Sequence, residues 1–165
     1  MPRDEEFGAY VARRRPHLYR SAWLLCGDRH RAEDLVQETL TKLYLAWPQV
    51  QRADSVEAYV RRALVNAHID EGRRPWRRER STAELPDDPG PARPSEDADE
   101  LWTALRALPA GQRRVVVLRH YWGLSIEETA EDLGVSTGTV KSQTSAALAS
   151  LRRVLVPEHV LGGER

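Results

Sequence analysis

A short part of the chain carries polar side chains of the types and spacing that bind nucleic acid. They recur at intervals of three or four residues, which places them on one face of an expected helix: Arg62, Asn66, Asp70 and Arg73. The run RRPWRRER follows over residues 73–80, and its arginines surround Trp76. A guanidinium group matches phosphate oxygens, and an indole ring stacks on an unpaired base. A solvated helix end, with charges that suit the helix dipole, explains the arginines equally well.

The segment LSIEETAEDLGVSTGTVKSQTSAALASLRRVL, residues 124–155, has the signals of a helix-turn-helix. These signals come in the expected order: a capping box at Ser125 and Glu128, a stop at Gly134 and a cap at Ser136. The second helix of such a pair reads DNA in the major groove. Here it carries Lys141 near its start and then no charge before Arg152, so few of its side chains suit phosphates. A helical hairpin that binds no DNA is the alternative.

The chain lacks the side-chain sets expected of an enzyme or a metal protein. Cys26 is the only cysteine and follows two leucines, so we expect a small buried side chain rather than a nucleophile. The five histidines have no metal-ligand spacing with it or with one another: residues 17, 30, 68, 120 and 159. No serine–histidine–acid set or glycine-rich phosphate loop stands out. We expect no catalytic residue, metal, cofactor or small-molecule substrate.

The spacing of apolar residues predicts the helices of the first half of the chain, which carry the candidate residues. Apolar side chains recur at helical spacing from Phe7 to Leu25, and Pro16 is expected to separate a short first helix from a second. Asp28 caps the next helix, whose apolar stripe runs up to Pro48. Ser55 caps a further helix that faces inward through a set of apolar residues: Val56, Tyr59, Val60, Ala63, Leu64 and Ala67.

The helix after Asp28 has a polar face opposite its apolar stripe. That face holds five residues: Glu33, Asp34, Gln37, Glu38 and Thr41. A solvated surface is the usual explanation for such residues, and a protein-binding face is the alternative.

The second half of the chain is expected to begin a new set of helices near Asp97. Leu101, Leu105 and Leu108 form one apolar stripe, and Pro109 suits the first turn of the following helix. The last helix is expected to face inward through four residues: Val140, Ala147, Leu148 and Leu151.

Charge divides the chain into three parts although the net charge is zero. Residues 1–80 carry 16 basic and 12 acidic groups, residues 81–100 carry 1 and 7, and residues 101–165 carry 8 and 6. The acidic part contains four prolines and a glycine, which is typical of a linker. We therefore predict an all-α protein of two small helical domains, 1–80 and 98–157, joined by an acidic, proline-rich linker, 81–97, and followed by a tail, 158–165.

Localisation follows from the same composition. A lone cysteine suits a reducing compartment, and no apolar run approaches the roughly 18 residues that cross a bilayer. The first residues, MPRDEEFG, are acidic where a signal peptide is basic. We expect a cytoplasmic protein without membrane contact.

Three segments together resemble the extracytoplasmic-function (group IV) sigma factors of bacterial RNA polymerase, in order and at the expected separations. They are DRHRAEDLVQETLTKLYLAW, VEAYVRRALVNAHIDEGRR and LSIEETAEDLGVSTGTVKS, and the resemblance spans about residues 5–156. The usage of arginine and tryptophan and the run GTVKSQT are similar to the actinobacterial branch. The resemblance implies a sigma factor that binds core RNA polymerase, recognises the −10 and −35 promoter elements and helps to melt the −10 region.

The same resemblance implies three groups of binding residues. The first domain, sigma region 2, would bind core polymerase through Asp34, Gln37 and Glu38. It would bind the −10 element, with Asn66 at the pocket for an unstacked base, through Arg52, Asp54, Ser55, Arg62, Asn66, Arg73 and Arg74. The second domain, sigma region 4, would bind the −35 element through Ser136, Thr137, Thr139, Lys141, Ser142 and Gln143.

The chain departs from the family pattern in its last helix. Family members commonly carry basic residues where this chain has Ala146 and Leu148, and an aromatic or similar residue where it has Ser145. We therefore expect weak −35 binding, with specificity that depends on the −10 element and on tethering to polymerase.

Further partners and rival functions remain open at the level of sequence. Family members are often held by an anti-sigma protein, and no residue here identifies such a partner. An adaptor that binds only proteins, or a sigma-like regulator without promoter recognition, is one alternative. A free-standing helix-turn-helix regulator is another, but it would normally dimerise, and no convincing dimer helix is present. We expect a monomer when the protein is free.

Overall fold

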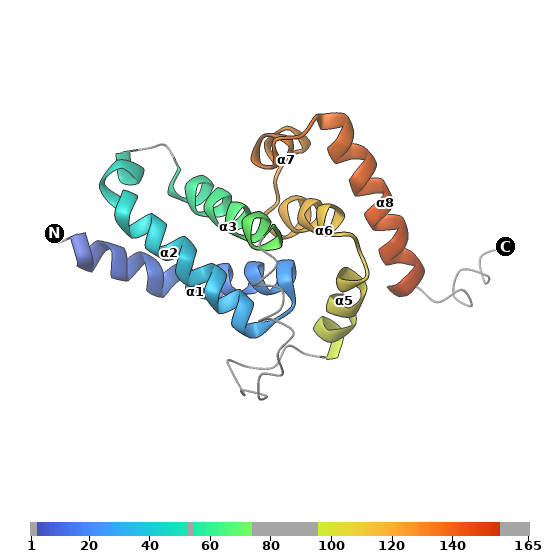
Figure 1. Ribbon diagram of the computed structural model, residues 1–165, viewed down its shortest axis with the longest axis horizontal. Coiled ribbons are helices and arrows are strands. Elements are labelled where there is room, and N and C mark those ends of the chain that lie inside the picture. The colour runs from blue at the N-terminus through green and yellow to red at the C-terminus, as the bar shows by residue number, and fades with distance from the viewer. Residues whose placement is uncertain (1–2, 53–54, 74–95, 156–165) are drawn as a thin grey trace. The chain divides into compact units, whose positions relative to one another are not determined.

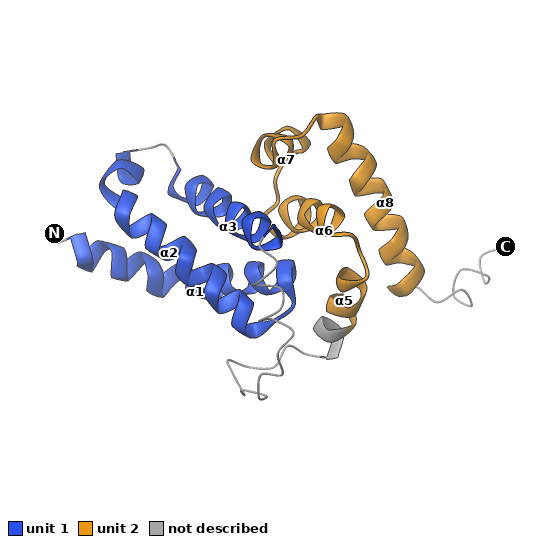
Figure 2. Cartoon of the chain, viewed as in Figure 1, with its two compact units in different colours: residues 1–88 blue, residues 89–165 orange. Residues whose placement is uncertain are grey.

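The computed structural model describes residues 3–52, 55–73 and 96–155, and every element in these ranges is helical (Figure 1). The expected all-α fold is therefore confirmed. The chain divides into two compact units, residues 1–88 and 89–165 (Figure 2). The expected linker up to residue 95 and the tail 158–165 lie outside the described residues.

The described part of unit 1 consists of three helices: α1 (Arg3–Cys26), α2 (Arg29–Arg52) and α3 (Val56–Gly72). Gly27, with φ at 69°, adopts the left-handed conformation that lets the chain leave α1. Asp28 caps α2 as expected, since its Oδ1 accepts hydrogen bonds from the backbone N–H groups of His30 at 2.8 Å and Arg31 at 3.1 Å.

Two prolines that were expected to interrupt helices lie inside them. α1 continues through Pro16, and α2 continues four residues beyond Pro48. Both prolines are exposed, and each leaves the carbonyl four residues earlier without its usual helical donor. The carbonyl affected by Pro48 is that of Tyr44, and it accepts a hydrogen bond from the guanidinium group of Arg3 instead. Buried residues on either side, such as Trp47 and Val50 around Pro48, hold both halves of the helix on the same core. The expected helix boundaries at Pro16 and Pro48 are wrong for this reason.

The core of unit 1 consists of apolar stripes from all three helices. Fully buried members include Leu18, Leu25, Leu35, Leu43 and Leu64. Burial of one such leucine contributes about 2 kcal/mol to stability. The stripe of α3 also includes buried side chains that the sequence pattern did not predict: Arg61, Val65, His68 and Glu71.

Aromatic rings join the beginning of α1 to the end of α2. The ring centroids of Phe7 and Tyr10 each lie 5.6 Å from that of Trp47, and Phe7 also packs edge-to-face against Tyr44. These contacts hold the last turns of α2, from which the chain passes to α3.

Two ion pairs tie α3 to its neighbours. Near its end, Glu71 is only 6% exposed at its side chain and accepts a hydrogen bond from Nε of Arg31, at the start of α2. Near its start, Glu57 accepts hydrogen bonds from Arg14 at 2.6 Å and from the hydroxyl group of Tyr10 at 3.1 Å. Both ends of α3 are therefore fixed by charged contacts from other helices.

The described part of unit 2 consists of four α-helices and one π-helical segment: α5 (Glu96–Arg106), α6 (Ala110–Val116), η1 (Val117–Tyr121), α7 (Ile126–Leu133) and α8 (Thr137–Leu155). Val115, Ala130 and Val140 form a buried cluster between α6, α7 and α8, against which Ile126 and Leu133 pack. The π-helical segment follows α6 directly and was not predicted.

The capping signals of the helix-turn-helix are all confirmed. Ser125 accepts a hydrogen bond from the backbone N–H of Glu128 at 3.0 Å, and Glu128 accepts one from the backbone N–H of Ser125 at 3.1 Å. Gly134, with φ at 66°, ends α7 in the left-handed conformation. Ser136 accepts from the backbone N–H of Thr139 at 3.1 Å and so begins α8.

Two leucines that were expected to face inward are exposed. Leu101 is 40% exposed, whereas Ala104, Leu105 and Leu108 are buried. On α8, Leu148 is 37% exposed, because the buried stripe runs through Val140, Ala147 and Leu151 instead. Leu148 adjoins Ala147 in sequence, and the 100° rotation between neighbours moves it off that stripe.

Replacing Glu71 with alanine should lower the free energy of unfolding of unit 1 by about 2 kcal/mol, because it leaves the half-buried guanidinium group of Arg31 without its carboxylate partner. Urea unfolding followed by circular dichroism measures the change. Glu5→Ala is the control, since Glu5 is exposed and its removal should change the free energy by less than about 0.5 kcal/mol. Equal unfolding curves for both variants would show that the ion pair contributes nothing.

Candidate functional site

The outer face of α2 carries the residues expected to bind a protein. Asp34 and Gln37 are exposed, while Glu38 is partly buried and forms an ion pair with Lys42 at 3.6 Å. The hydroxyl group of Thr41 donates to the backbone carbonyl of Gln37 at 2.8 Å. The three expected residues therefore share one exposed helix face, opposite the buried stripe of α2.

The beginning of α3 contains another part of the expected site. Oγ of Ser55 accepts a hydrogen bond from the backbone N–H of Ala58 at 2.9 Å and caps the helix. The Ser55 side chain therefore acts as the N-cap of α3. Arg52, the last residue of α2, is exposed, and Asp54 lies outside the described residues.

Polar side chains form a line along the outer face of α3. Arg62 and Asn66 of α3 are exposed, as is Arg73, the residue that caps the end of the helix. Their separations of four and seven residues bring them to nearly the same direction around the helix axis. Asp70 is partly buried, and Arg74 lies outside the described residues. The line presents two guanidinium groups on either side of one amide, which together can bind phosphates and the edge of an unpaired base.

The opposite side of α3 fixes this line in place. The Arg14–Glu57 ion pair and the hydrogen bond from Tyr10 to Glu57 join α1 to the first turn of α3. Burial and the adjacent Glu57 carboxylate raise the pKa of the Tyr10 hydroxyl, which therefore stays protonated and donates. These partners lie more than 40 residues apart in the chain, so no local sequence signal could have revealed them.

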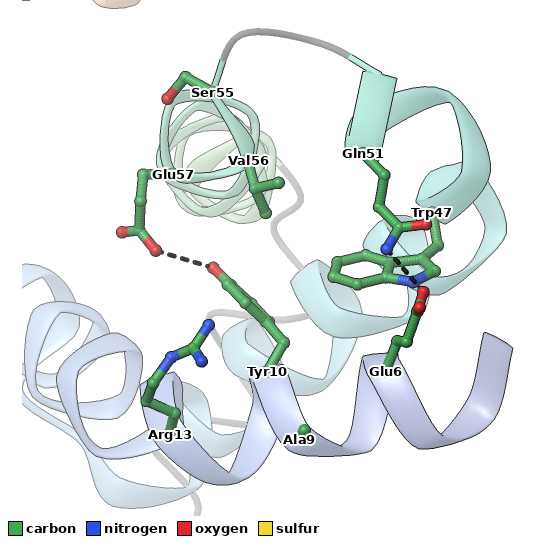
Figure 3. A pocket seen from close by; sticks show the side chains of 9 residues that line it. All are labelled: Glu6, Ala9, Tyr10, Arg13, Trp47, Gln51, Ser55, Val56 and Glu57. Carbon is green, nitrogen blue, oxygen red and sulfur yellow. Dashed lines mark hydrogen bonds between the residues drawn. The ribbon is translucent and has the colours of Figure 1, made fainter. Parts of the chain in front are cut away.

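A hollow of about 670 Å³ opens between α1, the end of α2 and the beginning of α3 (Figure 3). Tyr10, Trp47 and Val56 form its apolar walls. Two hydrogen bonds lie at its edge, from Gln51 to Glu6 at 2.8 Å and from Tyr10 to Glu57 at 3.1 Å. Asn66 does not line this hollow. The hollow is therefore not the base pocket that the resemblance places at Asn66.

The beginning of α8 holds the residues expected to read DNA. Ser136, Thr137, Lys141 and Ser142 are exposed. Thr139 is partly buried, and its hydroxyl group lies 2.9 Å from that of Ser136. The structure thus brings these five residues together within the first turns of α8.

Gln143 differs from the other residues of this group because its side chain packs within unit 2. It is partly buried, and a Cβ atom added at Gly111 of α6 would lie 3.4 Å from its Nε2. The Gln143 side chain therefore lies close to Gly111, and a larger residue at position 111 would crowd it.

The next turns of α8 expose mostly small or apolar side chains. Ser145, Ala146, Leu148 and Ala149 are all exposed, and the next charged residue is Arg152. This surface offers no guanidinium or ammonium group to phosphates. This agrees with the sequence, in which Ala146 and Leu148 stand where family members commonly carry basic residues.

Other kinds of site find little support in the part of the chain that is described. Its histidine, cysteine and acidic side chains form no group of three or more that could hold a metal ion. Burial raises the pKa of the Cys26 thiol to about 12, so the nucleophilic thiolate is scarce at neutral pH. Among the described helices, none is long and apolar enough to span a bilayer.

Comparison with known proteins matches each half of the chain to a family. Residues 10–78 match Sigma-70 region 2, and residues 98–151 match Sigma-70 region 4. The chain is 41% identical over 158 residues to RNA polymerase sigma-E factor of Streptomyces coelicolor, covering 92% of this chain and 86% of that protein. It is 34% identical over 167 residues to ECF RNA polymerase sigma factor SigE of Mycolicibacterium smegmatis, covering 94% of this chain and 62% of that protein.

Solved structures agree with these sequence matches. The sigma factor RpoE from Bartonella quintana, crystallised with the anti-sigma factor NepR, is 26% identical and superimposes with a TM-score of 0.74, covering 92% of this chain and 97% of that one. CnrH, solved with the cytosolic domain of CnrY, shares the fold at 24% identity, with a TM-score of 0.64 and 98% and 91% of the two chains covered. The two family matches and the similar sequences from Streptomyces and Mycolicibacterium show that the chain belongs to the extracytoplasmic-function sigma factors of RNA polymerase, in their actinobacterial branch.

Proposed function

We propose that this protein binds core RNA polymerase and directs promoter-specific transcription initiation. The observation that carries the proposal is the exposed line of Arg62, Asn66 and Arg73 along α3, in a chain that matches both sigma regions. Its binding partners are core polymerase and promoter DNA. The reaction itself belongs to the polymerase, and the sigma factor contributes recognition without catalytic activity of its own.

The exposed face of α2 is the proposed contact with core polymerase. Asp34 and Gln37 are accessible on it and Glu38 partly so, and a carboxylate favours a basic partner surface. Because the same helix packs the core with its other side, the partner binds to a rigid element.

The exposed face of α3 is the proposed contact with the −10 element. Extruding a base from a duplex costs a few kcal/mol, which hydrogen bonds to Asn66 and contacts of Arg62 and Arg73 with phosphates offset. Ser55 contributes by starting the helix that carries them. Arg52, the last residue of α2, and two residues outside the described part of the chain, Asp54 and Arg74, complete the proposed group.

The first turns of α8 are the proposed contact with the −35 element. Lys141 supplies the one positive charge there, and uncharged polar groups come from the rest of the proposed set: Ser136, Thr137, Thr139, Ser142 and Gln143. The uncharged surface that follows supports weak binding, which tethering through polymerase strengthens by raising the effective concentration.

Domain roles and further partners follow from the same proposal. Residues 1–80 act as sigma region 2 and residues 98–157 as sigma region 4, with the acidic segment 81–97 between them. The protein acts in the cytoplasm, where its polymerase is found. An anti-sigma protein is a further proposed partner, because the similar RpoE was crystallised with one.

An adaptor that binds only proteins is the second candidate function. It is favoured by one observation, the exposed small and apolar side chains on the middle of α8. The two candidates differ in whether the polar line on α3 is needed for transcription.

Asp34→Arg should weaken binding of the protein to core polymerase at least 10-fold, because it reverses a charge at the proposed contact. Gln37→Ala should weaken it less. Fluorescence titration of labelled protein with purified core polymerase measures both dissociation constants. Glu5→Arg makes the same charge change at an exposed position of α1 and should leave binding unchanged. Failure of the unaltered protein to bind polymerase would contradict the whole proposal.

Asn66→Ala combined with Arg73→Ala should abolish promoter-specific transcription while core binding is retained, because the base pocket and a phosphate contact are both lost. Transcription in vitro by the reconstituted holoenzyme measures the effect. The exposed Gln49→Ala serves as the control on α2. Normal transcription by the double variant would contradict the proposed role of these two residues, and absence of promoter-specific transcription with the unaltered protein would favour the adaptor.

Ala146→Arg should strengthen binding to a duplex that carries the −35 element and steepen its salt dependence by about one unit in the log–log slope, because one more phosphate is neutralised. Fluorescence anisotropy at several salt concentrations measures both quantities. Ala107→Arg adds the same charge at an exposed position outside α8 and is the control. Equal slopes for the two variants would place residue 146 away from the DNA.

A further inference from the structure

Leu45, on α2, is the only large aliphatic or aromatic side chain that is exposed among the described residues of unit 1. Its exposed fraction is 73%, the highest of the exposed large apolar side chains in the part of the chain that is described. Leucine and lysine have similar helix propensities, so α2 does not need an apolar residue at this position. The fold of unit 1 therefore gives no reason for its presence.

The position of Leu45 around the axis of α2 shows which face of the helix it belongs to. At 100° per residue, Asp34, Thr41 and Leu45 point within about 40° of one another. The buried residues Leu43 and Val50 point in the opposite direction, into the core. Pro48, one turn further on, is exposed beside Leu45. Leu45 thus lies on the same face as the proposed polymerase contact and extends it toward the end of the helix.

The polar side chains of this face are partly engaged within α2 itself. Glu38 pairs with Lys42 at 3.6 Å, and the Thr41 hydroxyl group donates to the carbonyl of Gln37 at 2.8 Å. Exposed ion pairs contribute little net affinity, whereas an apolar side chain contributes in proportion to the apolar area that binding removes from water. Leu45 is the exposed large aliphatic side chain of this face and therefore has apolar surface that binding can remove from water.

We infer that Leu45 is the apolar anchor of the contact between α2 and core RNA polymerase, an inference that rests on the proposed function. The occupant is a surface of the polymerase with an apolar side chain that covers Leu45 and basic side chains that meet Asp34 and Glu38. The charge of the face and its continuity with Asp34 and Gln37 favour this partner. Charged residues orient the approach, and Leu45 adds affinity through apolar contact.

Leu45→Gln tests this inference in the full-length protein, titrated with purified core polymerase at low and at high salt. The variant should bind roughly 10-fold more weakly at both salt concentrations, because removal of apolar contact is not screened by ions. Asp34→Asn should weaken binding mainly at low salt. Since Leu45 is exposed, its replacement should leave the thermal unfolding of the protein unchanged.

Leu101→Gln is the matched control, because it removes an exposed leucine from α5 of the other unit. Unchanged binding by the control, with weaker binding by Leu45→Gln, supports the anchor. If Leu45→Gln binds as tightly as the unaltered protein while Asp34→Arg does not, the anchor is wrong and the proposed function stands. Equal weakening by both leucine variants also overturns the anchor, since it indicates general hydrophobic adhesion. No binding by the unaltered protein would instead refute the proposed function.

Discussion

The burial of one face of each helix in unit 1 determines what the other faces can do. Leucines at helical spacing hold α2 and α3 against α1, so neither helix can rotate without exposing apolar surface. This constraint directs Asp34 and Gln37 of α2, and Arg62, Asn66 and Arg73 of α3, toward solvent. Recognition in this protein thus depends on a packing arrangement in which the recognising residues take little part.

Sequence reasoning succeeded where the determinants are local. The caps at Asp28, Ser55, Ser125 and Ser136 each depend on a side chain and a backbone group within three residues, and all four are present. It failed where tertiary contacts decide. Pro16 and Pro48 are carried through their helices by packing on both sides, and Leu101 and Leu148 lie beside the buried stripes rather than on them.

The candidate sites divide in the same way. Helical spacing was enough to predict that Arg62, Asn66 and Arg73 share an exposed face. The pairing of Glu71 with Arg31 and the contact of Gln143 with Gly111 join residues 40 and 32 positions apart, and no periodic pattern predicts such pairs. The resemblance assigns Gln143 to the −35 element, and its closeness to Gly111 of α6 is an additional feature that only the fold reveals.

The separation of inner and outer residues on α3 has a consequence for evolution. Arg62, Asn66 and Arg73 lie outside the apolar core, so most substitutions there change stability by only about 0.5 kcal/mol. Under the proposed function, descendants of such a gene can therefore acquire new promoter preferences by single mutations without first passing through unfolded intermediates. A duplicated copy of the gene is thus free to diverge toward a separate set of target genes while its scaffold is preserved.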